Sequence, residues 1–333
     1  MRRLCLTFLL TLAVTTLLQA QEPVAFDTVR VCTYRIDRFD SASHDRVEDL
    51  RTIFDAIEPQ VLCIQDFTSY NAVRLFRDSI MEMMDRPLLG NAFFITPPDH
   101  LQESFSVIFY DRSIFQGEHN LLAFDSTHAL LTLRLYHTGG DSMLVMTTEW
   151  RSGSTNDDRA RRAESARIVH KTLSTLIPQH WSTIENIFLA GTLNLHRSDE
   201  PAYQSLVGPD SGIFVDPIDR PGEWHGNAAF ADIHTSDARS GLIDRFDQIL
   251  LTPALMPRYL PGSYTVVGND GAHFGDSVAV LPNDSVSPEL ARTLQDASAH
   301  LPVYVDLLFE RPSSDVPEPS SMRELDLTIR GRR

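Results

Sequence analysis

The stretch Asp296-Ala297-Ser298-Ala299-His300-Leu301-Pro302-Val303 leads into the apolar run Val303–Phe309 near the end of the chain. Such a short apolar, β-branched run is typical of a buried strand. Seven runs of the same kind precede it, and they cover Val29–Ile36, Val61–Gln65, Phe105–Tyr110, Ala129–Tyr136, Met143–Thr148, Ile184–Ala190 and Gln248–Leu251.

Helical patterns lie between some of these strands. Apolar residues recur at helical spacing in Arg46–Ile57, Ala72–Met84 and Asp158–Leu176. The strands near Ala129 and Met143 are joined by a short turn at Gly139-Gly140, which indicates a mixed sheet. This pattern predicts an α/β (α+β) fold, a four-layer α/β/β/α sandwich of two mixed β-sheets flanked by helices.

The two ends of the chain differ in character from the rest. Met1-Arg2-Arg3, the apolar run to Leu18 and the small residue Ala20 have the features of a signal peptide. We therefore expect a signal peptide at 1–20, a folded domain at 21–311 and a disordered, Pro/Ser/acid-rich tail at 312–333. With no second long apolar run, the mature protein is expected to have no membrane span and to be secreted or periplasmic.

The charge balance argues mildly against a nucleic-acid partner. The chain has 29 Lys and Arg against 45 Asp and Glu, a net charge of −16. Nucleic-acid binders usually carry basic patches that neutralise phosphates. There is thus no strong nucleic-acid signature, although acidic nucleases exist. A salty habitat or GC-rich coding is the preferred explanation of the acidity.

Six segments resemble motifs of the endonuclease/exonuclease/phosphatase superfamily and follow one another in the same order as those motifs. They are Val29–Ile36, Glu58–Asp66, Met143–Ser154, Ile187–Asn194, Asp244–Leu251 and Ser298–Val303. Further matches, such as Trp224-His225-Gly226-Asn227 and Gly268-Asn269-Asp270-Gly271, resemble a secreted bacterial branch of this superfamily, so the resemblance covers roughly 28–309.

Most of the catalytic positions of the family are substituted in this chain. Where the family has Asn, His, Asp and Asp, the sequence has Arg35, Glu149, Thr192 and Ala299. A guanidinium has no lone pair for a cation, and a methyl has neither charge nor lone pair. A threonine hydroxyl cannot act as general base near neutral pH. Asp66 replaces the metal-binding glutamate with a shorter carboxylate.

Three positions are compatible with the family roles. The resemblance makes Asp247 the carboxylate that orients the catalytic histidine, His300, so we expect a hydrogen bond between them. Asn194 could still bond a phosphate oxygen. Because Arg35 and Glu149 are substituted with opposite charges, we also expect them to form an ion pair in the vacated site; a structural ion-paired arginine is favoured over a phosphate binder.

The resemblance implies Mg²⁺ or Mn²⁺ as cofactor in the family, with Asp66 the single remaining ligand candidate here. We expect no metal to be bound at this site. The sequence therefore favours a catalytically impaired relative of Mg²⁺-dependent phosphodiesterases that acts in binding, with its ligand unknown. The alternative is an active metal-dependent phosphodiesterase or nuclease that hydrolyses a phosphate ester with a modified site.

Two side-chain groups leave alternatives open. His225, His234 and His273 could form a surrogate metal site, although such histidines are more often hydrogen-bonded in loops. Cys32 and Cys63 each precede an active-site-equivalent position by three residues. In the usual family register their sulfurs would lie at one level on one face, so a disulfide is the alternative to two buried thiols.

Overall fold

The computed structural model describes residues 25–85, 87–88, 90–91, 105–124, 129–180, 185–210 and 212–311. The expected signal peptide at 1–20 and the expected tail at 312–333 lie outside the described residues. In the part of the chain that the structure describes, no helix has the length and hydrophobicity of a membrane-spanning segment.

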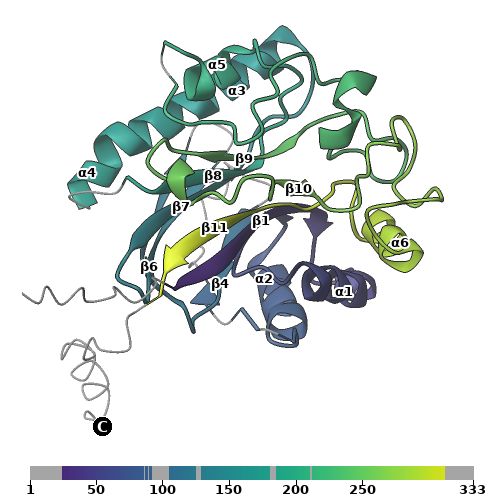
Figure 1. Cartoon of the computed structure of the whole chain (residues 1–333), viewed down its shortest axis with the longest axis horizontal. Helices are drawn as coiled ribbons and strands as arrows, with labels where there is room; N and C mark the ends of the chain where they lie inside the picture. Colours follow the sequence, from purple (N-terminus) through teal and green to yellow (C-terminus); the bar gives the residue numbers. More distant parts are fainter. Residues whose placement is uncertain are drawn as a thin grey trace, which may run out of the picture.

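Two mixed sheets form the centre of the molecule (Figure 1). The first sheet has the order β10-β11-β1-β2-β4-β3, with β1 and β2 parallel and the other pairs antiparallel. Its strands are β10 (Thr265–Val266), β11 (Val303–Glu310), β1 (Phe26–Phe39), β2 (Val61–Phe67), β4 (Phe105–Tyr110) and β3 (Gly90–Asn91).

The second sheet has the order β5-β6-β7-β8-β9, and only β7 and β8 run parallel. Its strands are β5 (Phe115–Phe124), β6 (Ala129–His137), β7 (Ser142–Glu149), β8 (Ile187–Thr192) and β9 (Asp247–Leu251). The Gly139-Gly140 turn joins β6 to β7 as the sequence predicts.

Helices cover the outer faces of both sheets (Figure 1). The helices α1 (Val47–Ile57) and α2 (Tyr70–Phe76) lie on the first sheet, α6 (Pro288–Ala297) lies beside α1, and α3 (Asn156–Lys171) and α5 (Pro201–Val207) cover the second sheet. The remaining helical segments are Ser43–Arg46, Arg77–Met81, Thr172–Leu176, α4 (Ile177–His180), Ala228–Ile233 and Met256–Arg258. This arrangement confirms the predicted sandwich.

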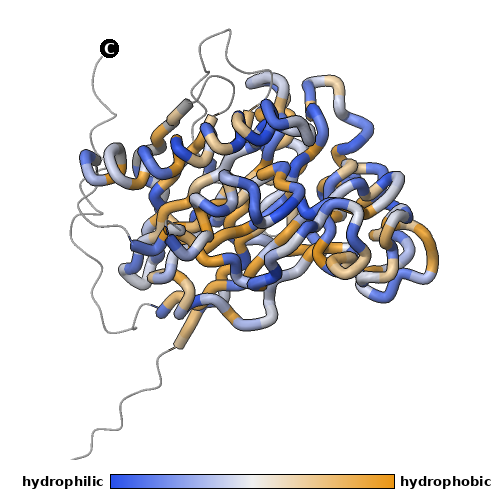
Figure 2. The backbone as a smooth tube through the Cα atoms, turned by 90° about the horizontal axis from the view of Figure 1, so that it is seen from above, coloured by the Kyte–Doolittle hydropathy of each residue, from blue (hydrophilic) through white to orange (hydrophobic). Residues whose placement is uncertain are grey.

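Strand alternation decides what each face of the first sheet contacts. On β1, Tyr34 points outward and its ring packs edge-on against Phe54 of α1, with centroids 6.1 Å apart. Thr33 points inward, where it bonds Gln65, and Gln65 Nε2 donates to Thr147 of the second sheet at 2.9 Å. The inward face of the first sheet thus contacts the second sheet. Hydrophobic segments are frequent in the middle of the molecule (Figure 2).

Three of the differences from the sequence prediction have local causes. The strand β5 was not predicted, because a register shift between Glu118 and Asn120 breaks the alternation of apolar residues. The predicted helix Ala72–Met84 is instead α2 followed by a π-helical turn, which buries both Ile80 and Met81. The helix α6, also not predicted, begins after the cap Ser287, whose hydroxyl accepts a hydrogen bond from Leu290 N.

The expectation that Cys32 and Cys63 lie at one level on one face is wrong. In the parallel pair, Cys32 is opposite Leu62 and Cys63 is opposite Thr33, so the register is offset by one residue. Because side chains alternate along a strand, the two sulfurs point to opposite faces of the sheet. Both cysteines are buried free thiols, and burial raises the pKa of each.

Neither Cys32 nor Cys63 should react with a thiol reagent such as Ellman's reagent while the protein is folded, because both are fully buried and protonated. In denaturant without reductant, both should react at once. Titration of the native and the unfolded protein, with peptide mapping, measures this. A peptide that contains Cys32 linked to Cys63 would contradict it.

Candidate functional site

The ends of five strands bring the candidate residues together at one end of the sandwich. Glu149 ends β7 and lies opposite Thr192 of β8, which lies opposite Asp247 of β9. Arg35 and Asp66 lie near the ends of β1 and β2 in the facing sheet. The strands β7 and β8 approach closely here, since a Cβ on Gly191 would lie 2.0 Å from the Thr148 carbonyl oxygen.

The Arg35 guanidinium lies at the centre of this group. Its Nη2 donates to Asp66 Oδ2 at 2.7 Å, and its Nε donates to Glu149 Oε1 at 2.9 Å. Its Nη1 donates to Asp37 Oδ1 at 3.0 Å and lies 3.0 Å from His300 Nε2. The expected pair between Arg35 and Glu149 is therefore confirmed, and Asp66 shares the same cation.

Electrostatics at this group depend on burial and on charge. Burial opposes the charge of Arg35, but the carboxylates of Glu149, Asp66 and Asp37 outweigh it and raise the pKa of Arg35. Burial also raises the pKa of Glu149, although Arg35 acts in the opposite direction. The Arg35 guanidinium therefore opposes the effect of burial on Glu149 and favours its charged form.

Asp37 is a member of the site that the sequence did not reveal. Its Oδ2 accepts the backbone N–H of Ala299 at 2.6 Å and a hydrogen bond from Arg239 at 3.1 Å. Burial opposes ionisation, but the Ala299 N–H and the charges of His300 and Arg35 lower the pKa of Asp37. Its position two residues after Arg35 was a signal in the sequence, since residues i and i+2 of a strand share a face. Asp37 has φ 42°, however, so strand alternation alone could not place its carboxylate.

The expected hydrogen bond between Asp247 and His300 is confirmed. Asp247 Oδ2 accepts from His300 Nδ1 at 2.7 Å, and Asp247 Oδ1 accepts from the Thr192 hydroxyl at 2.6 Å. Because Nδ1 carries the proton that Asp247 accepts, neutral His300 presents a lone pair at Nε2, which accepts from Arg35. The imidazole thus connects the cation to a fully buried carboxylate.

Two further candidates are held in left-handed backbone conformations. Asp66 has φ 76° at an irregularity in the β2 pairing, and this bend directs its carboxylate toward Arg35. Asn194 has φ 51°, and its Nδ2 donates to the Trp150 carbonyl at 2.7 Å. Its predicted contact with a phosphate oxygen stays a prediction.

The residues present do not fit the Mg²⁺ or Mn²⁺ that the fold suggests. The site still has several carboxylates, so it does not lack anionic oxygen. The carboxylates are instead paired with an arginine. Asp37, Asp66 and Glu149 already pair with the Arg35 cation at 2.7–3.0 Å. A divalent ion would have to displace a guanidinium that is tied down by four contacts.

The structure separates the three histidines that the sequence analysis grouped. His234 is buried and bonds the Trp224 and Leu242 carbonyls, and His273 bonds Asp270 and the Val280 carbonyl. Both histidines therefore make hydrogen bonds within loops, as the sequence analysis considered more common. His225 instead lies beside His196 and Asp244, two residues that the sequence analysis did not select.

Comparison with solved structures shows the fold of the endonuclease/exonuclease/phosphatase superfamily. An endonuclease/exonuclease/phosphatase family protein from Bacteroides thetaiotaomicron has a TM-score of 0.56 at 14% identity, with 86% of this chain and 97% of that chain covered. The human Nocturnin catalytic domain has a TM-score of 0.54 at 13% identity, covering 86% and 98%.

Humanized D. rerio TDP2 has a TM-score of 0.55 at 16% identity, with 85% of this chain and 99% of that chain covered. No protein-family model and no curated protein matches the sequence. The fold is therefore established by structure, while the chemistry has to be argued from the residues of the site.

Replacing Arg35 with methionine should lower the free energy of unfolding by about 2 kcal/mol or more, because it leaves three carboxylates without their shared cation. Urea denaturation measures the change. The matched control is Arg239→Met, an arginine that also pairs with Asp37 but is 43% exposed at its side chain, and its cost should stay below about 1 kcal/mol. Equal costs for the two variants would contradict the central role of Arg35.

The pKa of His300 should move in opposite directions in two variants. Burial lowers it, but the charge and hydrogen bond of Asp247 raise it above the ordinary value, while Arg35 opposes that rise. Asp247→Asn should therefore lower the pKa of His300 and Arg35→Met should raise it further. NMR titration of the imidazole measures both.

The same shift predicts a pH dependence of stability. Because the folded pKa of His300 lies above the unfolded value near ~6.5, protonated His300 stabilises the fold. That contribution is full below about pH 6.5 and is lost as the pH rises through the folded value. It should be absent in Asp247→Asn, and an unchanged pH profile in that variant would count against the assignment.

Proposed function

We propose that this protein is an exported, non-hydrolytic member of the endonuclease/exonuclease/phosphatase fold that acts by binding. The observation that carries the proposal is the Arg35 guanidinium, which is bonded to Asp37, Asp66 and Glu149 in the middle of the site. The positively charged Arg35 side chain pairs with the carboxylates that a divalent ion would need as ligands.

The chemistry of the remaining positions supports the same conclusion. The Thr192 hydroxyl donates a hydrogen bond to Asp247, so Thr192 offers no general base that could activate a water nucleophile. Ala299 contributes only its backbone N–H, which Asp37 accepts. Glu149 would repel a phosphate group rather than bind it. Removal of a general base alone commonly costs about 10²–10⁴ in rate, and here the metal ligands are compromised as well.

An active metal-dependent phosphodiesterase with a modified site is the second candidate. It is favoured by the intact pair of Asp247 and His300 and by Asn194, which keeps the residue type of the family motif. If the protein were such an enzyme, His300 would have to contact the scissile phosphate. Its Nε2 would then have to give up the hydrogen bond from Arg35 before it could contact the substrate.

The purified protein should show no Mg²⁺- or Mn²⁺-stimulated turnover of bis(p-nitrophenyl) phosphate or plasmid DNA, and calorimetry should detect no Mn²⁺ binding at Asp66. The companion variant Arg35→Asn, which returns the family residue and frees the carboxylates, should gain a Mn²⁺ site that the unmodified protein lacks, because oxygen ligands then become available.

Metal-stimulated turnover by the unmodified protein that is abolished in His300→Ala would overturn the proposal in favour of the second candidate. Turnover that survives His300→Ala points to a contaminating hydrolase. Since His300 is buried, circular dichroism of the variant should first show that it is folded.

A further inference from the structure

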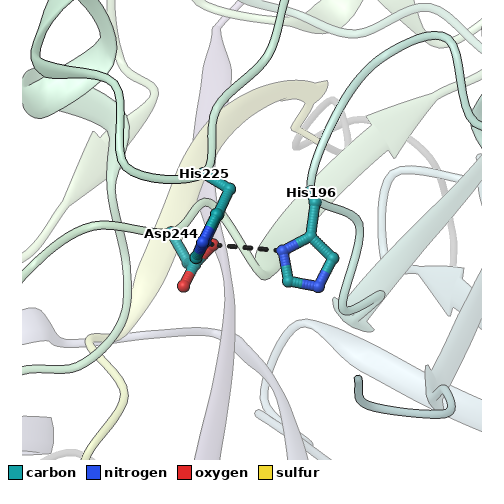
Figure 3. A group of neighbouring side chains, drawn as sticks. All are labelled: His196, His225 and Asp244. Carbon is teal, nitrogen blue, oxygen red and sulfur yellow. Dashed lines mark hydrogen bonds and ion pairs between the residues drawn. The ribbon is translucent and has the colours of Figure 1, made fainter. Parts of the chain in front are cut away.

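A second group of metal-ligating side chains lies apart from Arg35. His196, His225 and Asp244 each direct one ligand atom toward the others, and these atoms all lie within 4.8 Å (Figure 3). Among the described residues, this is the group of three or more His, Cys, Asp or Glu side chains with such spacing. His225 Nδ1 is 2.7 Å and His196 Nδ1 is 3.5 Å from Asp244 Oδ1.

The hydrogen bond of His196 to the backbone selects one tautomer of its neutral ring. Its Nε2 lies 3.2 Å from the Gly153 carbonyl oxygen, which can only accept, so Nε2 carries the proton. Nδ1 of the neutral ring therefore has a free lone pair that points toward Asp244. A backbone carbonyl that holds the far nitrogen of a histidine in this way is a usual feature of metal-ligating histidines.

His196 Nδ1 is also buried without a hydrogen-bond partner among the described residues, and only 9% of the residue is exposed. A buried polar atom that lacks a partner is costly, so such an atom calls for an explanation. Asp244 Oδ1 lies 3.5 Å away, at the limit of hydrogen-bond distance, and is already bonded to His225. A cation between the three side chains would satisfy this lone pair.

Backbone hydrogen bonds hold the three residues in place. The His196 carbonyl accepts from both Trp224 N and His225 N, at 2.9 and 3.1 Å. Gly226 N bonds the Ile243 carbonyl, and Asp244 pairs with Ser236. The segments that carry the ligands are thus joined to one another before any ion arrives.

The spacing suits a small tetrahedral cation. Ligand atoms around Zn²⁺ at about 2.0–2.1 Å are about 3.3 Å apart. The distance from His196 to Asp244 is already close to this value, and the distance from His225 to Asp244 has to widen by only about 0.6 Å. The His225 side chain is 52% exposed, so it can make this adjustment and leaves a path from solvent.

We propose that His196, His225 and Asp244 form a binding site for a divalent transition-metal cation, Zn²⁺ foremost. His196 and His225 supply Nδ1 and Asp244 supplies Oδ1, and the ion replaces the proton that now lies between His225 and Asp244. Two imidazoles and a carboxylate are donors that suit Zn²⁺ and not Mg²⁺, which prefers oxygen ligands. Three protein ligands leave a fourth position for water, which is the ligand count of an open zinc site.

The proposed site lies next to the Arg35 group and not within it. The Phe246 ring packs against His196 at 5.2 Å and against His300 at 6.4 Å, so it separates the two. The inference does not depend on the proposed function, because the hydrogen bonds of Arg35 within the described part of the chain go to Glu149, Asp37, Asp66 and His300 and to none of the three proposed ligands.

Calorimetry with ZnCl₂ on the metal-free protein, without a histidine tag, should show one Zn²⁺ bound per chain. His225→Ala should weaken binding by about 100-fold, since changes that only touch the outer partners of metal ligands already cost about 10–100-fold. Because His225 is half exposed, this variant should fold normally. His44→Ala, which removes an exposed histidine on the first sheet's helical side, is the matched control and should bind Zn²⁺ as the unmodified protein does.

Two other readouts separate binding at this site from binding elsewhere. The thermal midpoint should rise with Zn²⁺ in the unmodified protein and in His44→Ala, but not in His225→Ala or Asp244→Asn. Co²⁺ should give visible absorption bands that His225→Ala removes. Absence of saturable Zn²⁺ binding, or binding that His225→Ala leaves unchanged, overturns the proposal. Zn²⁺-dependent turnover lost in His225→Ala would support this site while refuting the non-hydrolytic function.

Discussion

The shared ion pair of one guanidinium with three carboxylates is the constraint on which the rest of the site depends. Asp66 comes from one sheet and Glu149 from the other, and Arg35 bonds both. Like charges this close and this well buried repel one another unless a cation lies between them. The guanidinium therefore joins the two sheets at the end where the fold would otherwise have to tolerate unpaired charge.

This constraint explains how a substituted site can remain well ordered. Arg35 reaches Asp37 and His300 as well, and His300 continues to Asp247 and then to Thr192. Every member of this chain of contacts has a polar partner, which is what keeps a buried polar network favourable. Within this network the Arg35 guanidinium supplies the positive charge beside Asp37, Asp66 and Glu149.

The sequence predicted the fold well because its signals are local. Eight of the strands follow apolar, β-branched runs, and the turn at Gly139-Gly140 indicates an antiparallel neighbour. The strand β5 escaped prediction because a bulge destroys its alternation, and the register of β1 with β2 could not be read from spacing. A one-residue offset reverses the face of every side chain, so Cys32 and Cys63 could be placed only in the folded sheet.

By itself, the sequence determined which residue types the site contains: the charges of Arg35 and Glu149, the lost carboxylate at Ala299 and the retained Asp247 and His300. The tertiary structure alone decided what these residues contact. Asp37 joins the site through a residue in the left-handed conformation. His196, His225 and Asp244 meet although the first and the last are 48 positions apart in the sequence. Spacing along a chain fixes local periodicity, but contacts between distant segments depend on sheet register and loop closure, which no short window of sequence encodes.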